Sequence, residues 1–279
     1  MKKILSLIAI PILLASCNIK NNTPISGDVF GVFLGAKSSR LSTLIKYDNV
    51  AIELEEFSSK DIEKLHDNDT NIYAYLSVGS LESYRSYYDE FKEYTFYDYD
   101  NWDDERWIDV SVKSWQDHIV STAKELYELG ADGLFLDNLD VYYIAIEEYK
   151  GSSSFVEGIY NGLHSIIEEL SKLDLYLLIN SGTMFLERLK DNNDSLINSF
   201  EWYAQESVFS TIIDYDKNIF GRQDEEEHQY CLEMIEMMKT YSNILMIEYT
   251  KDENLIEEIK EYANNNDIYY FISNNVNLE

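Results

Sequence analysis

The chain has 279 residues, of which 52 are acidic and 22 are basic, so its formal net charge is -30. A charge of this size argues against nucleic acid or anionic lipid as partners and makes a cationic ligand easier to accept. The hydrophobic content of 45% is enough for one large core, and Cys17 and Cys231 are the only cysteines.

Residues 1–16 read as a targeting signal rather than as part of a fold. Lys2 and Lys3 precede an apolar run, residues 4–14, that is too short to span a bilayer. The run ends in "LASC", which resembles the lipobox of bacterial lipoproteins, where the chain is cut before a cysteine that then carries lipid. An ordinary secretory signal with a chance cysteine is the alternative. With Cys17 lipidated, no intrachain disulfide remains, and Cys231 reads as a small buried helix residue.

This reading divides the chain into three parts. We expect a signal peptide at residues 1–16, a flexible tether from lipidated Cys17 to residue 28, and one domain over residues 29–279. The protein would then be anchored in the bacterial cell envelope and face the periplasm or the exterior.

Nine apolar runs with many β-branched and aromatic residues predict strands along the domain. They begin at Phe30, Val50, Ile72, Arg106, Gly133, Leu175, Ile197, Ile244 and Ile268. Helical patterns separate most of them, at residues 114–130, 153–173, 224–241 and 252–265. This alternation predicts a parallel sheet with covered faces, and nine strands with one extra at the entrance favour a single-domain α/β fold, a (β/α)8 TIM-type barrel. An open doubly wound sheet is the alternative.

Polar residues follow many of the predicted strands, where the active sites of such barrels lie. The run "GLFLDNLD" ends in Asp137, Asn138 and Asp140, and several other strands end in acids or amides. Repulsion makes each added carboxylate more costly, so a converging group favours function over turn formation.

Three reaction classes use such acids. Glycoside hydrolysis needs two carboxylates and aromatic residues that stack on sugars, and the chain holds 23 tyrosines and four tryptophans. The four histidines fall in predicted helices without metal-ligand spacing, so we expect neither a metal nor another cofactor. No nucleophile elbow supports serine or cysteine catalysis. Glycoside hydrolysis is the reading that fits best.

Five motifs then resemble one family. They are "YAYLSVGSLESYR", "WIDVSVKSW", "GADGLFLDNLDVY", "LLINSG" and "SFEWYAQES". In order and spacing they are similar to the endo-α-1,4-polygalactosaminidases of glycoside hydrolase family 114, over roughly residues 50–249. The resemblance implies a (β/α)8 hydrolase that cuts α-1,4-linked galactosamine polysaccharide. It matches Asp137 to the catalytic aspartate, read here as nucleophile, and Glu201 to the catalytic glutamate, read as general acid/base, with exchanged roles as an alternative.

Other strand-end residues are candidates for substrate binding. Asp140 could bind the sugar or cap a turn, and Arg85 could pair with Glu82 on a helix surface or lie at the site entrance. The full set comprises Tyr75, Ser77, Glu82, Arg85, Asp109, Asn138, Asp140, Asn180, Tyr203, Gln205 and Glu248. Tyr75, Tyr203 and Trp202 are the sugar-stacking candidates. Two other functions remain open: a non-catalytic carbohydrate-binding surface lipoprotein, and a divalent-metal hydrolase using Asp109, Asp137 and Glu201.

Overall fold

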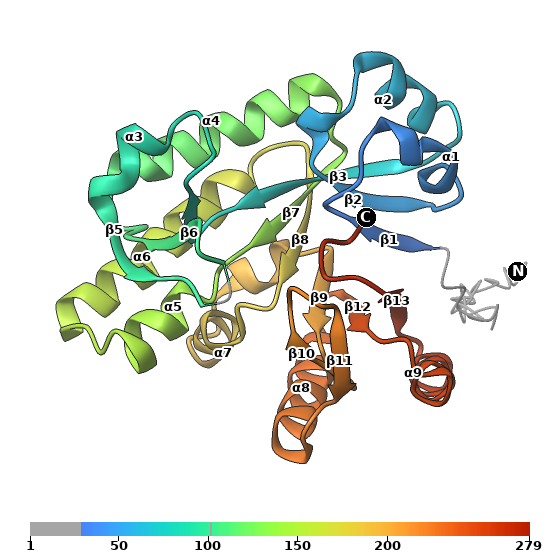
Figure 1. The fold of residues 1–279 in the computed structure, drawn as a ribbon. Helices are drawn as coiled ribbons and strands as arrows, with labels where there is room; N and C mark the ends of the chain where they lie inside the picture. The colour runs from blue at the N-terminus through green and yellow to red at the C-terminus, as the bar shows by residue number, and fades with distance from the viewer. Residues whose placement is uncertain (1–28, 101) are drawn as a thin grey trace, which may run out of the picture.

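A computed structural model describes residues 29–100 and 102–279, and its centre is an eight-stranded parallel sheet (Figure 1). The strands are β1 (Phe30–Phe33), β2 (Asn49–Ile52), β3 (Asn71–Ser77), β7 (Gly133–Asp137), β8 (Tyr176–Asn180), β9 (Trp202–Glu206), β12 (Asn243–Tyr249) and β13 (Tyr269–Ser273). They pair in this order, and β13 returns to lie against β1. The sheet is therefore a nearly closed (β/α)8 barrel, and its order has no reversal of the kind that a doubly wound sheet requires.

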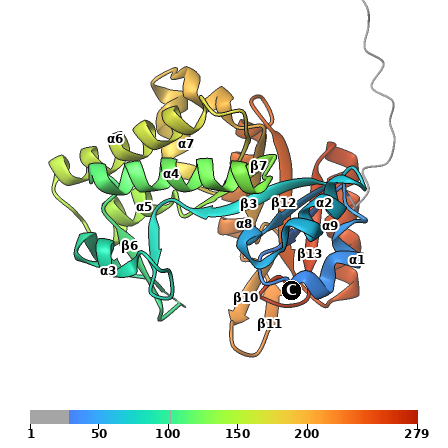
Figure 2. The same cartoon turned by 90° about the horizontal axis from the view of Figure 1, so that it is seen from above.

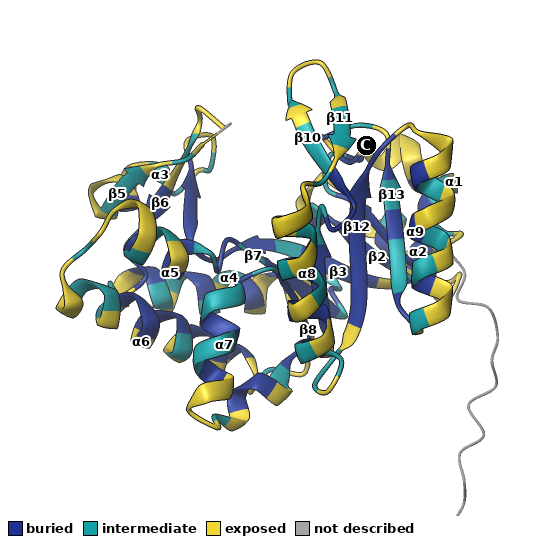
Figure 3. Ribbon diagram, turned by 90° about the horizontal axis from the view of Figure 1, so that it is seen from below, coloured by how far each residue is buried: buried dark blue, intermediate teal, exposed yellow. Residues whose placement is uncertain are grey.

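Helices surround the barrel, and their outer faces are exposed (Figure 3). In α4, Trp115, Ile119, Ala123 and Leu126 are buried on one face, and the helix stops at Gly130 with a φ of 109°. The helices are α1 (Leu41–Leu44), α2 (Ser59–His66), α3 (Tyr88–Phe91), α4 (Lys113–Leu129), α5 (Val141–Tyr143), α6 (Ser153–Leu170), α7 (Thr183–Asp191), α8 (Glu225–Met238) and α9 (Glu253–Asn266). Short 3-10 turns lie at Ser38–Arg40, Leu54–Glu56, Lys92–Tyr94 and Ser195–Ser199, and a π turn at Ile144–Glu148.

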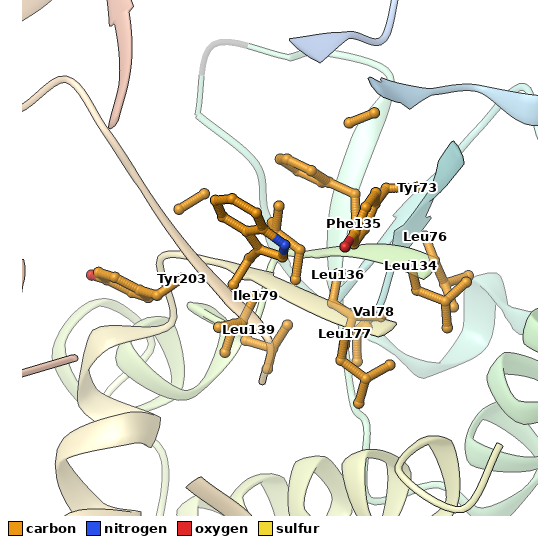
Figure 4. Packing of buried hydrophobic residues seen from close by; sticks show 14 of the residues in the cluster. Tyr73, Leu76, Val78, Leu134, Phe135, Leu136, Leu139, Leu177, Ile179 and Tyr203 are labelled. Carbon is orange, nitrogen blue, oxygen red and sulfur yellow. The ribbon is translucent and has the colours of Figure 1, made fainter. Parts of the chain in front are cut away.

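Side chains alternate across the barrel wall, as the pleat of a strand dictates. Phe135 lies on one side of the ribbon, whereas Leu134 and Leu177 lie on the other, toward the helices (Figure 4). At the amino-terminal end of the barrel, the rings of Phe30 and Trp202 are 5.1 Å apart. These rings fill the amino-terminal end of the barrel. A ligand can therefore enter only at the carboxyl ends of the strands.

Two insertions rise from those carboxyl ends on the same side of the barrel (Figures 2 and 3). The first follows β3 and forms an antiparallel sheet from β4 (Ser80–Glu82), β5 (Thr95–Asp98) and β6 (Glu105–Ile108). The second follows β9 and is a hairpin of β10 (Ser210–Asp214) and β11 (Ile219–Arg222). The apolar run at Arg106 forms β6, which lies outside the barrel. It is therefore the extra strand among the nine that the sequence predicted.

The structure corrects the predicted strand at Ile197. Residues Ser195–Ser199 form a 3-10 turn, started by Asp194, whose side chain accepts a hydrogen bond from the Leu196 N–H. The barrel strand begins only at Trp202. This shift of several residues decides which glutamate reaches the site.

The predicted signal peptide, tether and lipidation residue Cys17 lie outside the described residues. Within the described part of the chain, no helix has the length and apolar character needed to cross a membrane. Cys231 is buried in α8.

Candidate active site

A cavity of about 750 Å³ opens between the two insertions at the carboxyl ends of the barrel strands. Its aromatic walls include Tyr75, Tyr99, Trp107 and Tyr249. Among the described residues that line it, none is lysine, arginine or histidine, whereas nine are acidic: Glu53, Glu82, Asp100, Asp104, Glu105, Asp137, Asp140, Glu206 and Glu279. Such a cavity attracts a cationic ligand.

Asp137 ends β7 and lies in this cavity, where three donors hold its carboxylate. Asn180 Nδ2 and the Asn138 N–H donate to Oδ1 at 3.0 and 2.9 Å, and the Tyr75 hydroxyl donates to Oδ2 at 3.2 Å. Burial raises the pKa of Asp137, while these hydrogen bonds to the ionised form act in the opposite direction.

Glu206 ends β9 and shares a donor with Asp137. Asn180 Nδ2, at the end of β8, donates to Glu206 Oε1 at 2.7 Å, and the Tyr249 hydroxyl donates to Oε2 at 2.8 Å. Burial raises the pKa of Glu206, and the charge of Asp137 raises it further. Three neighbouring strands thus bring two partly buried carboxyl groups together through one amide.

Glu201 is not part of this pair, and the structure does not bring the predicted second catalytic acid into the cavity. It precedes β9, at the amino-terminal end of the barrel, and its exposed side chain accepts a hydrogen bond from Asn243 Nδ2 at 3.2 Å. Strand β9 runs from Trp202 to Glu206, so Glu206 is the glutamate at its carboxyl end. The predicted strand at Ile197 begins too early, which places Glu201 rather than Glu206 near its carboxyl end.

Arg85 joins two acids at the edge of the site. Its Nε donates to Glu82, and its Nη2 donates to Glu53 Oε1 at 2.7 Å. Glu82 also accepts from the Tyr84 hydroxyl at 2.6 Å and is buried in the cavity wall. Arg85 itself does not line the cavity, so it acts by neutralising and fixing these two carboxylates.

Asn138 follows Asp137 with a φ of 64° and anchors the first insertion to the barrel. Its Nδ2 donates to the hydroxyls of Ser77 and Ser80 at 3.0 and 2.9 Å and to Glu105 Oε1 at 3.1 Å. The Tyr99 hydroxyl donates to its Oδ1 at 2.9 Å. Ser77 is buried beneath this network and does not line the cavity.

Asp140 lines the cavity close to Asp137 and Glu206. Both of its carboxylate oxygens accept from the Gly182 N–H at 3.3 Å. Burial, together with the charge of Asp137, raises its pKa to about 7. Asp140 is therefore bound to a backbone N–H group and also lines the cavity.

Three predicted substrate-binding residues on β9 and β12 point away from the cavity. Tyr203 is completely buried and its hydroxyl donates to Gln205 Oε1, so neither side chain is available to stack on or bind a sugar. Glu248 is also fully buried, and accepts from the N–H groups of Phe209 and Ser210, both at 2.9 Å. These positions alternate with Glu206 and Tyr249, which face inward.

Asp109 is also absent from the cavity lining, as are the predicted residues Ser77, Arg85, Tyr203, Gln205 and Glu248. Its Oδ1 accepts from the N–H and the hydroxyl of Ser111, at 2.9 and 2.5 Å, just before α4. This is the local hydrogen bonding typical of an aspartate in a turn. Arg106, on β6, forms an ion pair with Asp98.

No group of three or more histidine, cysteine, aspartate or glutamate side chains within residues 29–100 and 102–279 is arranged to hold a metal ion. The histidines lie on helices: His66 pairs with Asp132, and His164 with Asp194. Asp137 and Glu206 have amide and hydroxyl donors as partners, whereas Glu53 and Glu82 pair with Arg85.

The model of the family "Glycoside-hydrolase family GH114" matches residues 14–277. No curated protein sequence matches the chain closely enough to be compared.

Solved structures of similar fold cover nearly the whole chain. The glycoside hydrolase domain of PelA from Pseudomonas aeruginosa is 20% identical, covering 90% of this chain and 95% of that one, with a TM-score of 0.74. Ega3 from Aspergillus fumigatus, in complex with galactosamine, is 15% identical, covering 92% and 94%, with a TM-score of 0.69. An α-galactosidase from Thermus thermophilus is 8% identical, covering 88% and 57%, with a TM-score of 0.56. At these identities, the likeness is one of fold.

Proposed function

The chain belongs to glycoside hydrolase family GH114 and is a glycosidase, and on this premise we propose that it cleaves α-1,4-linked galactosamine-containing polysaccharide with Asp137 and Glu206 as its catalytic carboxylates. The observation that carries this proposal is the amide of Asn180, which binds both carboxyl groups at the floor of the acidic cavity. Two carboxyl groups on either side of a glycosidic bond are what such hydrolysis requires.

The hydrogen bonds support different roles for the two acids. Asp137 accepts three bonds that favour its ionised form, so we assign it as the nucleophile. Glu206 accepts two, and the negative charge of Asp137 nearby favours its protonated form, so we assign it as the general acid/base.

The reaction then has two steps. Asp137 attacks the anomeric carbon while Glu206 gives its proton to the leaving glycosidic oxygen, and the carbon–oxygen bond breaks. Glu206 next removes a proton from water, which attacks the same carbon and releases Asp137.

The separation of the two acids favours retention of configuration. Asn180 Nδ2 lies 3.0 Å from Asp137 Oδ1 and 2.7 Å from Glu206 Oε1, so these two oxygens are at most about 5.7 Å apart. Retaining enzymes place the two groups about 5–5.5 Å apart, whereas inverting enzymes need about 6.5–9.5 Å for a water molecule.

The lining of the cavity supports an amino sugar as substrate. Its acids favour a polymer that carries ammonium groups, and the rings of Tyr99 and Trp107, stacked with centroids 4.5 Å apart, provide an aromatic wall. Ega3, whose fold this chain shares, was solved with galactosamine.

The test is release of reducing ends from partially deacetylated α-1,4-galactosaminan by the wild-type protein and by Asp137→Asn. We expect release by the wild type and almost none by the variant, with product of retained configuration by NMR at early times. Binding without product by a folded wild-type protein would contradict the proposed catalytic function.

We also propose that Cys17 carries a lipid that anchors the enzyme in the bacterial cell envelope, facing the periplasm or the exterior. The sequence "LASC" after a short apolar run supports this. Incorporation of an alkyne-tagged fatty acid into the expressed chain, lost in Cys17→Ser, is the expected result. Equal labelling of both proteins would argue against lipidation at this residue.

A further inference from the structure

A π turn forms one edge of the cavity. Ile144 lines the cavity and is the first residue of this turn, Ile144–Glu148. The Tyr149 N–H donates to the Ile144 carbonyl oxygen at 2.8 Å, which is the i→i+5 hydrogen bond that defines such a turn. Turns of this kind are rare and are often found at functional sites. The hydrogen bond places Tyr149 one turn beyond the edge of the cavity.

The sheet of the first insertion leads to the same place. Trp107 of β6 lines the cavity, and its direct partner on β5 is Tyr97. Opposite residues of an antiparallel pair share one face of a sheet, so Tyr97 lies on the same face as Trp107. The ring centroids of Tyr97 and Tyr149 are 6.3 Å apart. Two separate segments therefore bring aromatic side chains together beyond one edge of the cavity.

Tyr149 is exposed although other rings hold it in place. Its ring centroid is 5.0 Å from that of Phe96 and 5.3 Å from that of Phe155, at interplanar angles of 66° and 57°, so neither ring is stacked parallel to it. The residue nevertheless keeps 44% of its surface exposed. Within residues 29–100 and 102–279, no group is hydrogen-bonded to its hydroxyl. Tyr149 thus presents a fixed apolar ring with a polar tip, the combination that suits a partly apolar, partly wet ligand.

We propose that Tyr97 and Tyr149 form an outer binding site for sugar units of the polysaccharide that lie beyond the cavity, and that this site makes the enzyme prefer long chains over short oligosaccharides. The identity of the polymer rests on the proposed function. A pyranose ring has an apolar C–H face that packs on an aromatic ring, and hydroxyl groups that can bond the free tyrosine hydroxyl. Because the outer site is remote from the bond that is cut, it binds the ground state and the transition state equally. Its loss should therefore raise KM and leave kcat unchanged.

The experiment compares a long α-1,4-galactosaminan with the corresponding trisaccharide as substrates of Tyr149→Ala. We expect KM for the long polymer to rise about three- to tenfold, the usual worth of one aromatic contact, with kcat within about twofold of the wild type. The kinetic constants for the trisaccharide should stay within about twofold, because the cavity alone binds it. This second substrate also reports whether the variant is folded. Tyr149→Phe keeps the ring and should retain most of the affinity for the polymer.

The matched control is Tyr176→Ala, which removes a tyrosine that is 55% exposed at the start of β8, at the opposite end of the barrel. It should leave KM for both substrates unchanged. An unchanged KM for the polymer in Tyr149→Ala would overturn the proposal, as would equal losses on the polymer and the trisaccharide. A lower sedimentation coefficient in Tyr149→Ala with an unchanged KM would show that the rings contact another protein chain, and would overturn it too.

A binding measurement separates this proposal from the proposed function. If the wild type cuts neither substrate, native electrophoresis through a gel that contains the long polymer still applies. Retardation of the wild type and of Tyr176→Ala that is reduced in Tyr149→Ala would support the outer site, although the assigned reaction would fail. Equal retardation of all three proteins, or none of the wild type, would overturn the inference.

Discussion

Glu201 and Glu206 lie at opposite ends of the same strand, β9. Glu206 ends the strand inside the cavity, where it shares Asn180 with Asp137. Glu201 precedes the strand at the other end of the barrel, where it is exposed and contacts Asn243. The two glutamates that flank the length of β9 therefore provide a catalytic candidate and a matched control.

Glu206→Gln is expected to lower kcat on galactosaminan by about 10²- to 10⁴-fold, the usual contribution of a general acid/base. Glu201→Gln should keep nearly full activity, because its exposed side chain contacts Asn243 and does not line the cavity. Steady-state kinetics of both variants provide the test. Loss of activity in Glu201→Gln alone would return the catalytic role to that residue.

Asn180→Leu removes the donor that Asp137 and Glu206 share. A hydrogen bond to a carboxylate lowers its pKa, so the pKa of each acid should rise in the variant. Because Asp137 must be ionised and Glu206 protonated, both limbs of the pH profile of kcat/KM should move to higher pH, with a loss of rate. These limbs belong to the coupled pair. An unchanged profile would rule out the shared amide as a determinant of either pKa.

Tyr249→Phe tests the two acids separately. The Tyr249 hydroxyl donates only to Glu206, and this bond lowers the pKa of Glu206. Its loss should move the alkaline limb of kcat/KM to higher pH and leave the acid limb close to its wild-type position. Movement of the acid limb alone would mean that the nucleophile and the acid are exchanged.

Glu248→Gln should affect folding rather than substrate binding. Its carboxylate accepts from the N–H groups of Phe209 and Ser210 and from the Ser210 hydroxyl, and an amide cannot accept all of these bonds. We expect a loss of about 1–3 kcal/mol in the free energy of unfolding. KM should stay within about twofold. A raised KM with normal stability would instead place Glu248 at the substrate.

The free energy of unfolding should fall as pH rises from about 4.5 to 7. Burial raises the pKa of Glu248 and of Asp140 to about 7 in the folded protein, above the ordinary values of 4.5 and 3.8. In this window the folded state binds more protons than the unfolded state, so raising the pH favours unfolding. Urea titrations at several pH values measure this. Stability that rises across the same window would contradict the raised pKa values.

The fold was largely predictable from the sequence because each barrel strand is a short apolar run. The position of Asp137 was predictable for the same reason, since "GLFLD" turns polar at one residue. Glu201 misled the prediction because "INSFEWY" has strand-like composition, yet Asp194 starts a 3-10 turn there. Starting β9 at Trp202 instead places Trp202 and Glu206 on the inner face and Tyr203 and Gln205 on the outer one.

Glu105 had no comparable signal in the sequence. It reaches the cavity because β6 pairs antiparallel with β4, which places Glu105 opposite Glu82. That pairing belongs to an insertion whose position depends on Asn138 and Ser80, far away in the chain. Contacts of this kind arise from tertiary structure and leave no periodic pattern.

The cavity also carries its own fluorescent probe. Trp107, Trp115 and Trp202 are buried, whereas Trp102 is 38% exposed at the cavity rim, with its ring centroid 6.0 Å from that of Tyr215 in the other insertion. Emission that an aqueous quencher can reach should therefore come mainly from Trp102. A polysaccharide that enters between the insertions would shield this one indole, so binding can be followed optically on the unlabelled protein, with Trp102→Phe as the silent reference.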